Sequence, residues 1–199
     1  LDGLLDDLFE LAQLDAGGPP AARTPHAPAD LVADALERFR PLAEGRGVAL
    51  AGEATTGAAV ALAGEATTGA AVAVQPGKIE RVLGNLIGNA LRHTPPGGQV
   101  TLAAGETPEG VVFRVEDTGP GFSAADLAYG FEQFYRGEEA RTRATGGAGL
   151  GLAIARGIVQ AHGGHIWAEN RAEGGARVGF LLPRAGKVAA GSGVPLTGN

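Results

Sequence analysis

Two asparagines and an arginine are spaced so that they share one face of an expected helix. Asn85, Asn89 and Arg92 stand at positions i, i+4 and i+7, which places two neutral amides and one cation on the same side. Asparagine is unfavourable inside a helix because its side chain competes for backbone hydrogen bonds. The motif therefore indicates a polar partner, although a pair of solvated asparagines would have the same spacing.

A carboxylate stands where an apolar strand gives way to a glycine-rich turn. Asp117 follows residues 111–116 and precedes Thr-Gly-Pro-Gly, in which Gly119 and Gly121 let the backbone approach a ligand closely. A carboxylate in this position can accept a hydrogen bond from an exocyclic amine. An ordinary turn after a strand is the alternative when the motif is taken alone.

A second glycine-rich segment runs directly into a helical pattern. Residues 146–154 read Gly-Gly-Ala-Gly-Leu-Gly-Leu-Ala-Ile, and the free N–H groups and dipole at the start of a helix favour phosphate. The segment is not a Walker loop, because no Gly-Lys-Ser/Thr follows. It is not a convincing dinucleotide fingerprint either, because it lies late in the chain without a second βαβ half. A lone glycine-rich loop is weak evidence for a phosphate site, but the three motifs together predict one nucleotide pocket.

Helices and a sheet must hold these groups in one place. The strongest helical pattern covers 78–93, where an apolar stripe lies opposite the asparagines. Other helices are expected over 1–16, from an N-cap at Asp30 to near Pro41, after a capping box of Ser123 and Asp126, and over 150–162. Strands are expected over 100–104, 111–116, 165–169 and 176–182, and a mobile lid over 136–149.

The segment 49–72 contains two unchanged copies of Ala-Leu-Ala-Gly-Glu-Ala-Thr-Thr-Gly-Ala-Ala-Val. Each copy predicts a short strand followed by a turn, so the pair suggests a hairpin whose strands present the same side chains to the same face. We interpret the repeat as a neutral duplication. Two interchangeable strands would nevertheless compete for one position in the sheet or exchange between molecules.

Composition narrows the classes of function. With 22 acidic and 16 basic residues, the net charge is -6, which disfavours binding to nucleic acid or to an anionic membrane. The chain has no cysteine, so disulfides and thiolate metal sites are excluded. It shows neither a long apolar run nor a signal-peptide pattern. It also has no methionine, from which we expect it to begin inside a longer polypeptide.

The order of the motifs resembles the catalytic domain of bacterial sensor histidine kinases, within the ATPase superfamily that includes gyrase and a heat-shock chaperone. The matching boxes are the asparagine box at 85–94, the glycine boxes at 117–121 and 147–152, the phenylalanine box at 131–136, and the segments 161–166 and 174–176. The resemblance implies an α+β fold, a two-layer sandwich of a mixed β-sheet and about three helices (the Bergerat or GHKL ATP-binding fold).

The resemblance also implies domain limits. The expected parts are the end of the second dimerisation helix at 1–17, a linker at 18–29, the ATP-binding catalytic domain at 30–183, including the duplication at 49–72, and a disordered tail at 184–199. Two positions depart from the family pattern. Gln75 stands before Pro76, where an acid is frequent, and Ala176 replaces a frequent threonine.

Roles in binding ATP and Mg²⁺ follow from the resemblance. Asn89 would hold Mg²⁺, Asn85 would lie near the triphosphate, and Asp117 would accept from the adenine amino group. Arg92 would neutralise phosphate charge, and a lid arginine would meet the γ-phosphate; the candidates are Arg136, Arg141 and Arg143. The other implied nucleotide contacts are His93, Gly119, Gly121, Gly147, Gly149, Leu150, Gly151 and Leu152. Phe131, Phe134 and Tyr135 are expected to pack within the lid rather than to stack on the base.

Asn85 favours a kinase over an ATPase. ATPases of this superfamily carry a water-activating glutamate at that position, whereas a neutral amide accepts no proton and spares the γ-phosphate for a histidine nucleophile. The four histidines do not lie in a typical acceptor sequence, so the acceptor is expected upstream; they are His26, His93, His162 and His165. An ATPase and a non-catalytic ATP-binding module remain the alternatives.

The expected partners follow from the same resemblance. They are the protein's own dimerisation and phosphoacceptor domain, in a homodimer, and a response regulator. No nucleic acid partner is expected, and contact with a membrane is expected only through upstream segments. The chain would be the cytoplasmic portion of a membrane-anchored kinase.

Overall fold

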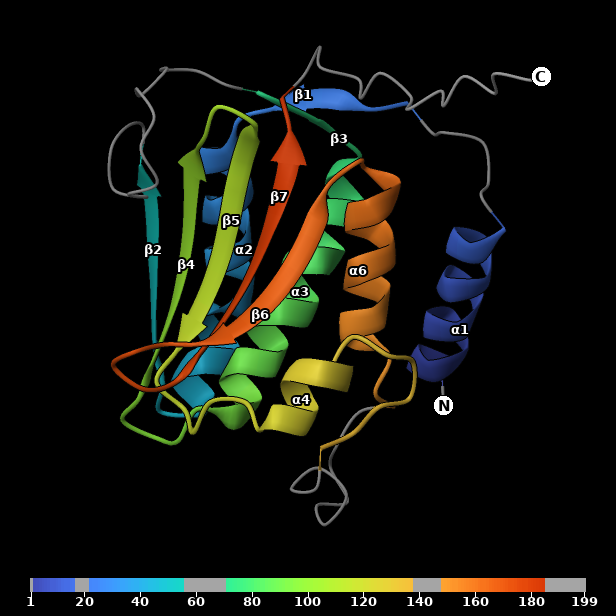
Figure 1. Cartoon of the computed structure of the whole chain (residues 1–199). Coiled ribbons are helices and arrows are strands. Elements are labelled where there is room, and N and C mark those ends of the chain that lie inside the picture. Colours follow the sequence, from blue (N-terminus) through green and yellow to red (C-terminus); the bar gives the residue numbers. More distant parts are fainter. Residues whose placement is uncertain (1, 17–21, 56–70, 138–147, 185–199) are drawn as a thin grey trace, which may run out of the picture.

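A computed structural model describes residues 2–16, 22–55, 71–137 and 148–184 (Figure 1). Within these ranges no helix combines the length and the apolar character needed to cross a lipid bilayer. The predicted lid falls mostly on residues 138–147, which lie outside the described part, as does the predicted tail beyond Arg184.

The main body has two layers, a five-stranded mixed sheet and a layer of helices on one of its faces (Figure 1). The strands, in the spatial order β2-β4-β5-β7-β6, are β2 (Ala49–Thr55), β4 (Gln99–Glu106), β5 (Gly110–Asp117), β7 (Ala176–Pro183) and β6 (His165–Asn170). Strands β2 and β4 are parallel and the other neighbours are antiparallel. The covering helices are α2 (Pro28–Gly45), α3 (Pro76–His93) and α6 (Gly151–Ala161). The predicted α+β sandwich is therefore confirmed.

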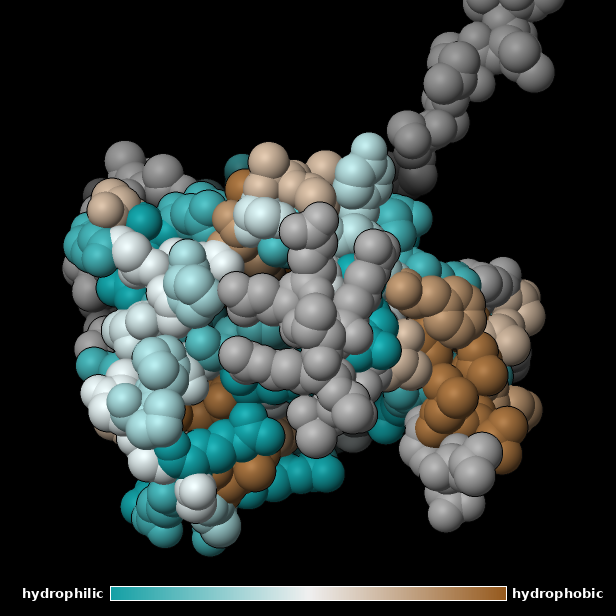
Figure 2. All heavy atoms as spheres, turned by 90° about the horizontal axis from the view of Figure 1, so that it is seen from below, coloured by the Kyte–Doolittle hydropathy of each residue, from teal (hydrophilic) through white to brown (hydrophobic). Residues whose placement is uncertain are grey.

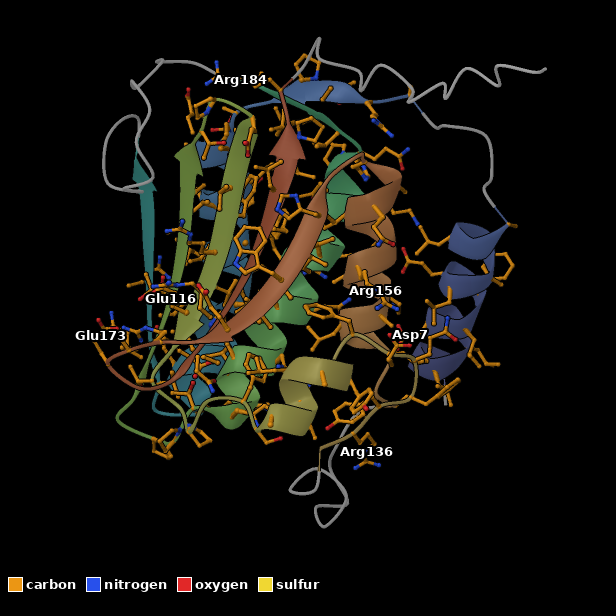
Figure 3. The ribbon with its side chains drawn as sticks, in the orientation of Figure 1. Asp7, Glu116, Arg136, Arg156, Glu173 and Arg184 are labelled. Carbon is orange, nitrogen blue, oxygen red and sulfur yellow. The ribbon has the colours of Figure 1, made fainter. Side chains whose placement is uncertain are left out.

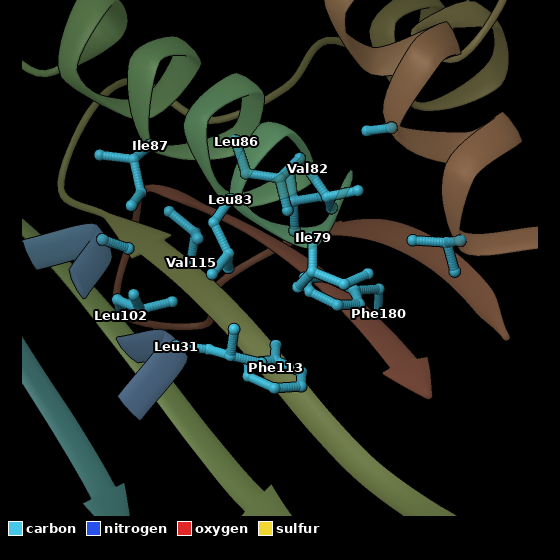
Figure 4. Close-up of a cluster of buried hydrophobic side chains, with 14 of the residues drawn as sticks. Leu31, Ile79, Val82, Leu83, Leu86, Ile87, Leu102, Phe113, Val115 and Phe180 are labelled. Carbon is cyan, nitrogen blue, oxygen red and sulfur yellow. The ribbon is translucent and has the colours of Figure 1, made fainter. Parts of the chain in front are cut away.

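The apolar stripe of α3 forms the centre of the core (Figure 4). The buried side chains of α3 face the inner side of the sheet. Together with residues of the strands they form a cluster that includes Ile79, Val82, Leu83 and Leu86 of α3 and Leu102, Phe113, Val115 and Phe180 of the sheet. Phe113 and Phe180 pair across β5 and β7 and stack with ring centroids 4.9 Å apart. This packing fixes the rotation of α3 about its axis, so its asparagine face is turned away from the core.

Both ends of helix α2 differ from the predicted ends, which were Asp30 and a position near Pro41. Ala27 is its N-cap residue and Asp30 lies inside the first turn, so the prediction of Asp30 as the cap is wrong. Pro28 occupies the first turn, where the N–H that proline lacks would have no helical partner. The helix also continues past Pro41 to Gly45, with Ala43 buried beyond the proline. Packing on both sides of Pro41 thus outweighs the hydrogen bond that proline removes.

A second, two-stranded sheet lies at the end of the molecule remote from α4 (Ala124–Tyr129), as Figure 1 shows. Strand β1 (Thr24–His26) pairs antiparallel with β3 (Val72–Val74). Because β1 falls within residues 18–29, part of the expected linker is paired with the body rather than free. Arg184, expected in the tail, also bridges to Val72 and donates to the Thr107 carbonyl oxygen at 3.1 Å.

The N-terminal helix α1 (Asp2–Asp15) packs against α6 and α3. Leu11 is buried, and Glu10 is 8% exposed and accepts from Lys78 Nζ at 2.7 Å. Arg81 forms ion pairs with Asp7 and Glu10. The outer side of α1 stays apolar and exposed, as the patch over this helix in Figure 2 shows; its residues are Leu4, Leu5, Leu8 and Phe9.

The first copy of the duplication supplies the edge strand β2. Leu50 pairs with Val100 of β4 and packs against the core. The second copy, with the hairpin partner predicted for β2, lies mostly outside the described residues, and its last residue, Val72, opens β3.

Deleting residues 61–72 should leave the fold intact. Val60 then replaces the identical Val72, and residues 56–59 join β2 to β3. We expect a melting temperature within about 2 °C of wild type and unchanged affinity for ATP. A large loss of either would contradict the neutral interpretation of the repeat.

A matched pair of substitutions tests whether the two copies exchange. Leu50→Asp should lower the melting temperature, because it places a charge against the core, whereas Leu62→Asp, its equivalent in the second copy, should not. Wild-type stability of both single variants would instead show that either copy can form β2.

His162, at the end of α6, predicts a loss of stability in mild acid. It is 4% exposed, its Nδ1 lies 2.7 Å from the Ile158 carbonyl oxygen, and the Gln75 N–H donates to its Nε2 at 3.3 Å. Burial, together with the charges of Arg23 and Lys78, lowers the pKa of His162. The unfolded chain therefore binds this proton first, and the stability that the neutral ring contributes is lost as the pH falls below about 6.5.

The measurement is urea denaturation between about pH 5 and pH 8. The midpoint for wild type should fall towards the acid end, and His162→Gln should flatten that dependence. An equally steep dependence in the variant would assign the effect to other groups.

Candidate functional site

The asparagine face of α3 meets the second glycine-rich segment. Asn85 Nδ2 donates to the carbonyl oxygen of Gly151 at 2.9 Å, at the start of α6. Leu150 is buried, Leu152 packs against the core, and Gly149 lies against the backbone of Phe134 and Tyr135. Two motifs separated by 66 residues are thus joined by one amide, with the N-terminus of α6 beside the polar face of α3.

The last turn of α3 carries a cation without an acidic partner. Arg92 Nη1 donates to Asn89 Oδ1 at 3.3 Å, and no carboxylate of the described residues lies within ion-pair distance of Arg92. Partial burial of its guanidinium, and then the nearby charge of Arg46, lowers the pKa of Arg92, although the residue as a whole is exposed. Arg46 itself donates to the Leu91 carbonyl oxygen at 2.9 Å. Two neighbouring cations at this place favour an anion.

Asp117 is nearly buried, with 7% of its surface exposed, and its side chain is held from two directions. Its Oδ1 accepts from the backbone N–H of Gly119 at 2.8 Å and from that of Ala176 at 3.2 Å. Both bonds converge on one oxygen. The second oxygen, for which the described residues supply no donor, is therefore the one that a ligand amine would meet.

The first glycine-rich turn also reaches the end of α3. A side chain at Gly119 would come within 2.8 Å of the His93 carbonyl oxygen, so only glycine fits there without displacing the backbone. Gly121 follows with a positive φ of 83°. The end of the asparagine box and the Asp117 turn are therefore direct neighbours.

Helix α4 and the segment after it are anchored beside this turn. The capping box of Ser123 and Asp126 is confirmed, and Tyr135 Oη donates to Asp126 Oδ1 at 3.1 Å. Burial acts to raise the pKa of Asp126, but hydrogen bonds from Ser123 and Tyr135 and the charge of His93 lower it overall. Arg156 of α6 forms an ion pair with Glu132 at 3.0 Å, so the segment that leads into the predicted lid is tied to the body by two contacts.

Only some of the predicted lid residues lie within the described part of the chain. Arg136 is described and lies below α4 at the edge of the body (Figure 3). Gly147, Arg141 and Arg143 lie outside the described residues. Among the lid aromatics, Phe131 packs against the core as expected, whereas Phe134 is 58% exposed and takes a positive φ of 62°. The packing expected of Phe134 within the lid stays a prediction, because most of the lid lies outside the described residues.

Several supporting residues escaped the sequence analysis. Arg46 lies beside Arg92 because α2 ends next to α3. Asn170, the last residue of β6, and Arg171, which follows it, reach the Asp117 turn. No spacing in the sequence indicates these contacts, since they cross 45 to 54 residues. In the sequence, only the matching segment 174–176 pointed to this part of the site, and of the residues that contact Asp117 it contains Ala176.

Comparison with known proteins shows the family to which the chain belongs. A family model described as "Histidine kinase-, DNA gyrase B-, and HSP90-like ATPase" matches residues 74–186. The chain is 36% identical to the signal transduction histidine-protein kinase BaeS of Escherichia coli over 92% of this chain and 37% of that protein. It is 47% identical to the sensor histidine kinase WalK of Bacillus subtilis over 53% of this chain and 18% of that protein. The chain thus spans well under half the length of these relatives.

Solved structures share the fold. Full-length ShkA in complex with AMPPNP matches with a TM-score of 0.74 and 28% identity, over 92% of this chain and 35% of that one. The catalytic domain of the histidine kinase ThkA matches with a TM-score of 0.67 and 25% identity, over 82% of this chain and 97% of that one. The family match, the identity to relatives and the shared fold agree, and the chain belongs to the histidine kinase-, DNA gyrase B- and HSP90-like ATPase family, with sensor histidine kinases as its relatives.

Proposed function

We propose that this chain binds Mg-ATP and donates the γ-phosphate to a histidine of a dimerisation domain in a two-component signalling system. The observation that carries the proposal is the state of Asn85. Its amide nitrogen is engaged with the Gly151 carbonyl oxygen, and a neutral amide takes no proton from water. A pocket that positions ATP without activating water keeps the phosphate for another nucleophile.

The described contacts support a role for each nucleotide-binding group. The unengaged oxygen of Asp117 would accept from the adenine amine. Arg92 and the N-terminus of α6, with Gly149, Leu150, Gly151 and Leu152, would face the phosphates. Asn85, His93 and the Gly119 and Gly121 turn would close the pocket between these two ends. Gly147 and a lid arginine remain expected contributors on the strength of the resemblance alone.

Asn89 suits Mg²⁺ as a single protein ligand. No group of three or more acidic, histidine or cysteine side chains in the described ranges could hold a metal by itself. Mg²⁺ prefers oxygen ligands and commonly takes only one or two from the protein, the rest being water and substrate phosphate. The amide oxygen of Asn89, which accepts a hydrogen bond from Arg92 Nη1 in this structure, is such a ligand. The bound ion would neutralise charge on the phosphates.

The partners are inferred from α1 and from the resemblance. The exposed apolar residues Leu4, Leu5, Leu8 and Phe9 support pairing of α1 with further dimerisation helices, which would carry the acceptor histidine in a homodimer. A response regulator would then receive the phosphate. By the same resemblance, the chain would be the cytoplasmic portion of a membrane-anchored kinase.

Nucleotide binding is tested at the two ends of the pocket. Asp117→Asn and Asn89→Asp should each weaken Mg-ATP by at least about tenfold, through loss of a buried acceptor and through repulsion of phosphate, respectively. The measurement is titration calorimetry, with the melting temperature confirming that the fold persists. Asp34→Asn, an exposed site on α2, is the matched control. Wild-type affinity in both site variants would contradict the assignment.

Phosphoryl transfer is tested in trans. The chain, Mg²⁺ and γ-labelled ATP are added to a separately made dimerisation hairpin from the same gene. We expect acid-labile label on the hairpin histidine and little release of inorganic phosphate without the hairpin, because Asn85 supplies no base. Rapid phosphate release without labelling would favour an ATPase. ATP binding without either labelling of the hairpin or release of phosphate would favour a non-catalytic ATP-binding module.

A further inference from the structure

The connection between β6 and β7 lies directly against the Asp117 turn. Figure 3 shows this connection, with Glu173 labelled on it, passing the end of β5 beside Glu116. The two segments are more than 45 residues apart in the sequence, yet side chains and backbone groups of both meet at several atoms.

Asn170 holds the far end of the turn. Its Oδ1 accepts from the Phe122 N–H at 2.7 Å, and its Nδ2 donates to the Phe122 carbonyl oxygen at 2.9 Å. A side-chain amide can donate and accept at once. Asn170 therefore fixes both polar backbone groups of the residue that follows Gly121.

Arg171 holds the near end. Its Nη1 donates to the carbonyl oxygen of Asp117 at 2.9 Å, while its Nε lies 3.4 Å from Glu116 Oε2. The Glu116 carboxylate thus lies beside the guanidinium that binds the Asp117 carbonyl oxygen, and its charge attracts this cation, although Nε itself has no hydrogen-bond partner among the described residues.

The backbone of the connection is shaped for this contact. Gly175, with a φ of 89°, lies so close to the Asp117 carbonyl oxygen that a Cβ would come within 1.9 Å of it. The Arg171 N–H donates to the Gly175 carbonyl oxygen at 3.0 Å, which closes the connection on itself. Ala176 then presents its N–H to Asp117 Oδ1.

We propose that Asn170 and Arg171 are positioning residues for recognition of the base: they hold the two ends of the 117–122 turn, so that the free oxygen of Asp117 faces an exocyclic amine of the nucleotide. This inference rests on the proposed role of Asp117 as the acceptor of that amine. Neither residue needs to touch the nucleotide, and their effect is on discrimination between bases rather than on phosphate binding.

The experiment compares ATP with inosine triphosphate, which has the same phosphates but lacks the exocyclic amine. Affinities of both are measured by calorimetry for wild type, Asn170→Ala, Arg171→Met, Arg171→Lys and Asp117→Asn, with melting temperatures alongside. Glu173→Ala is the control, since Glu173 is an exposed carboxylate on the same connection.

We expect Asn170→Ala and Arg171→Met to weaken ATP by about tenfold and inosine triphosphate by less than about twofold, so that the preference for ATP falls. Arg171→Lys, which keeps a donor, should retain part of that preference. Glu173→Ala should match wild type. Arg171→Met also serves if Asn170→Ala fails to fold, because Arg177 continues to pair with Glu116.

Three outcomes would overturn the inference. Wild-type preference for ATP in both variants would show that the turn needs neither residue. Equal weakening of both nucleotides, together with a lower melting temperature, would reduce the two residues to a structural role. A wild-type chain that binds no ATP, or does not prefer it, with Asp117→Asn unchanged, would instead remove the proposed function itself.

Discussion

The burial of one face of α3 against the sheet is the interaction on which the other features depend. The stripe from Ile79 to Ile87 packs on Phe113, Val115 and Phe180. Since a helix has a fixed angular spacing, burying this stripe also fixes the direction of Asn85, Asn89 and Arg92. Loosening that contact would disperse the polar groups even if every one of them remained in the chain.

The proposed base end and the proposed phosphate end of the nucleotide site are built differently. At the base end, Asp117 is nearly buried and backbone N–H groups from two segments converge on one of its oxygens. At the phosphate end, Arg92 and Arg46 lie near each other without acidic partners in the described structure. In the proposed function, the first arrangement would give directional recognition of one amine, and the second would attract negative charge without requiring a single geometry.

The fold reaches these ends through contacts between distant segments. Asn85 joins α3 to α6, Gly119 lies on the end of α3, and the β6–β7 connection supports the Asp117 turn. The proposed site therefore combines three parts of the chain whose mutual positions are fixed by the core and by a few side-chain hydrogen bonds. Such support is what holds recognition groups in place before a ligand arrives.

The sequence by itself determined the two-layer α+β fold and the family. Apolar periodicity predicted α3 and the strands β4, β5, β6 and β7, because local spacing is set by helix and strand geometry, and the order of the asparagine and glycine boxes indicated the family. Local pattern failed for α2, where packing beyond Pro41 outweighed a helix-breaking residue, and it did not indicate strand β1, which pairs with β3.

Tertiary structure alone decided which oxygen of Asp117 is free, which group Asn85 binds, and that Asn170, Arg171 and Arg46 support the site. These contacts join segments that are 45 or more residues apart in the sequence. They depend on how the packed layers bring the ends of helices and strands together, and no repeating interval in the sequence indicates them.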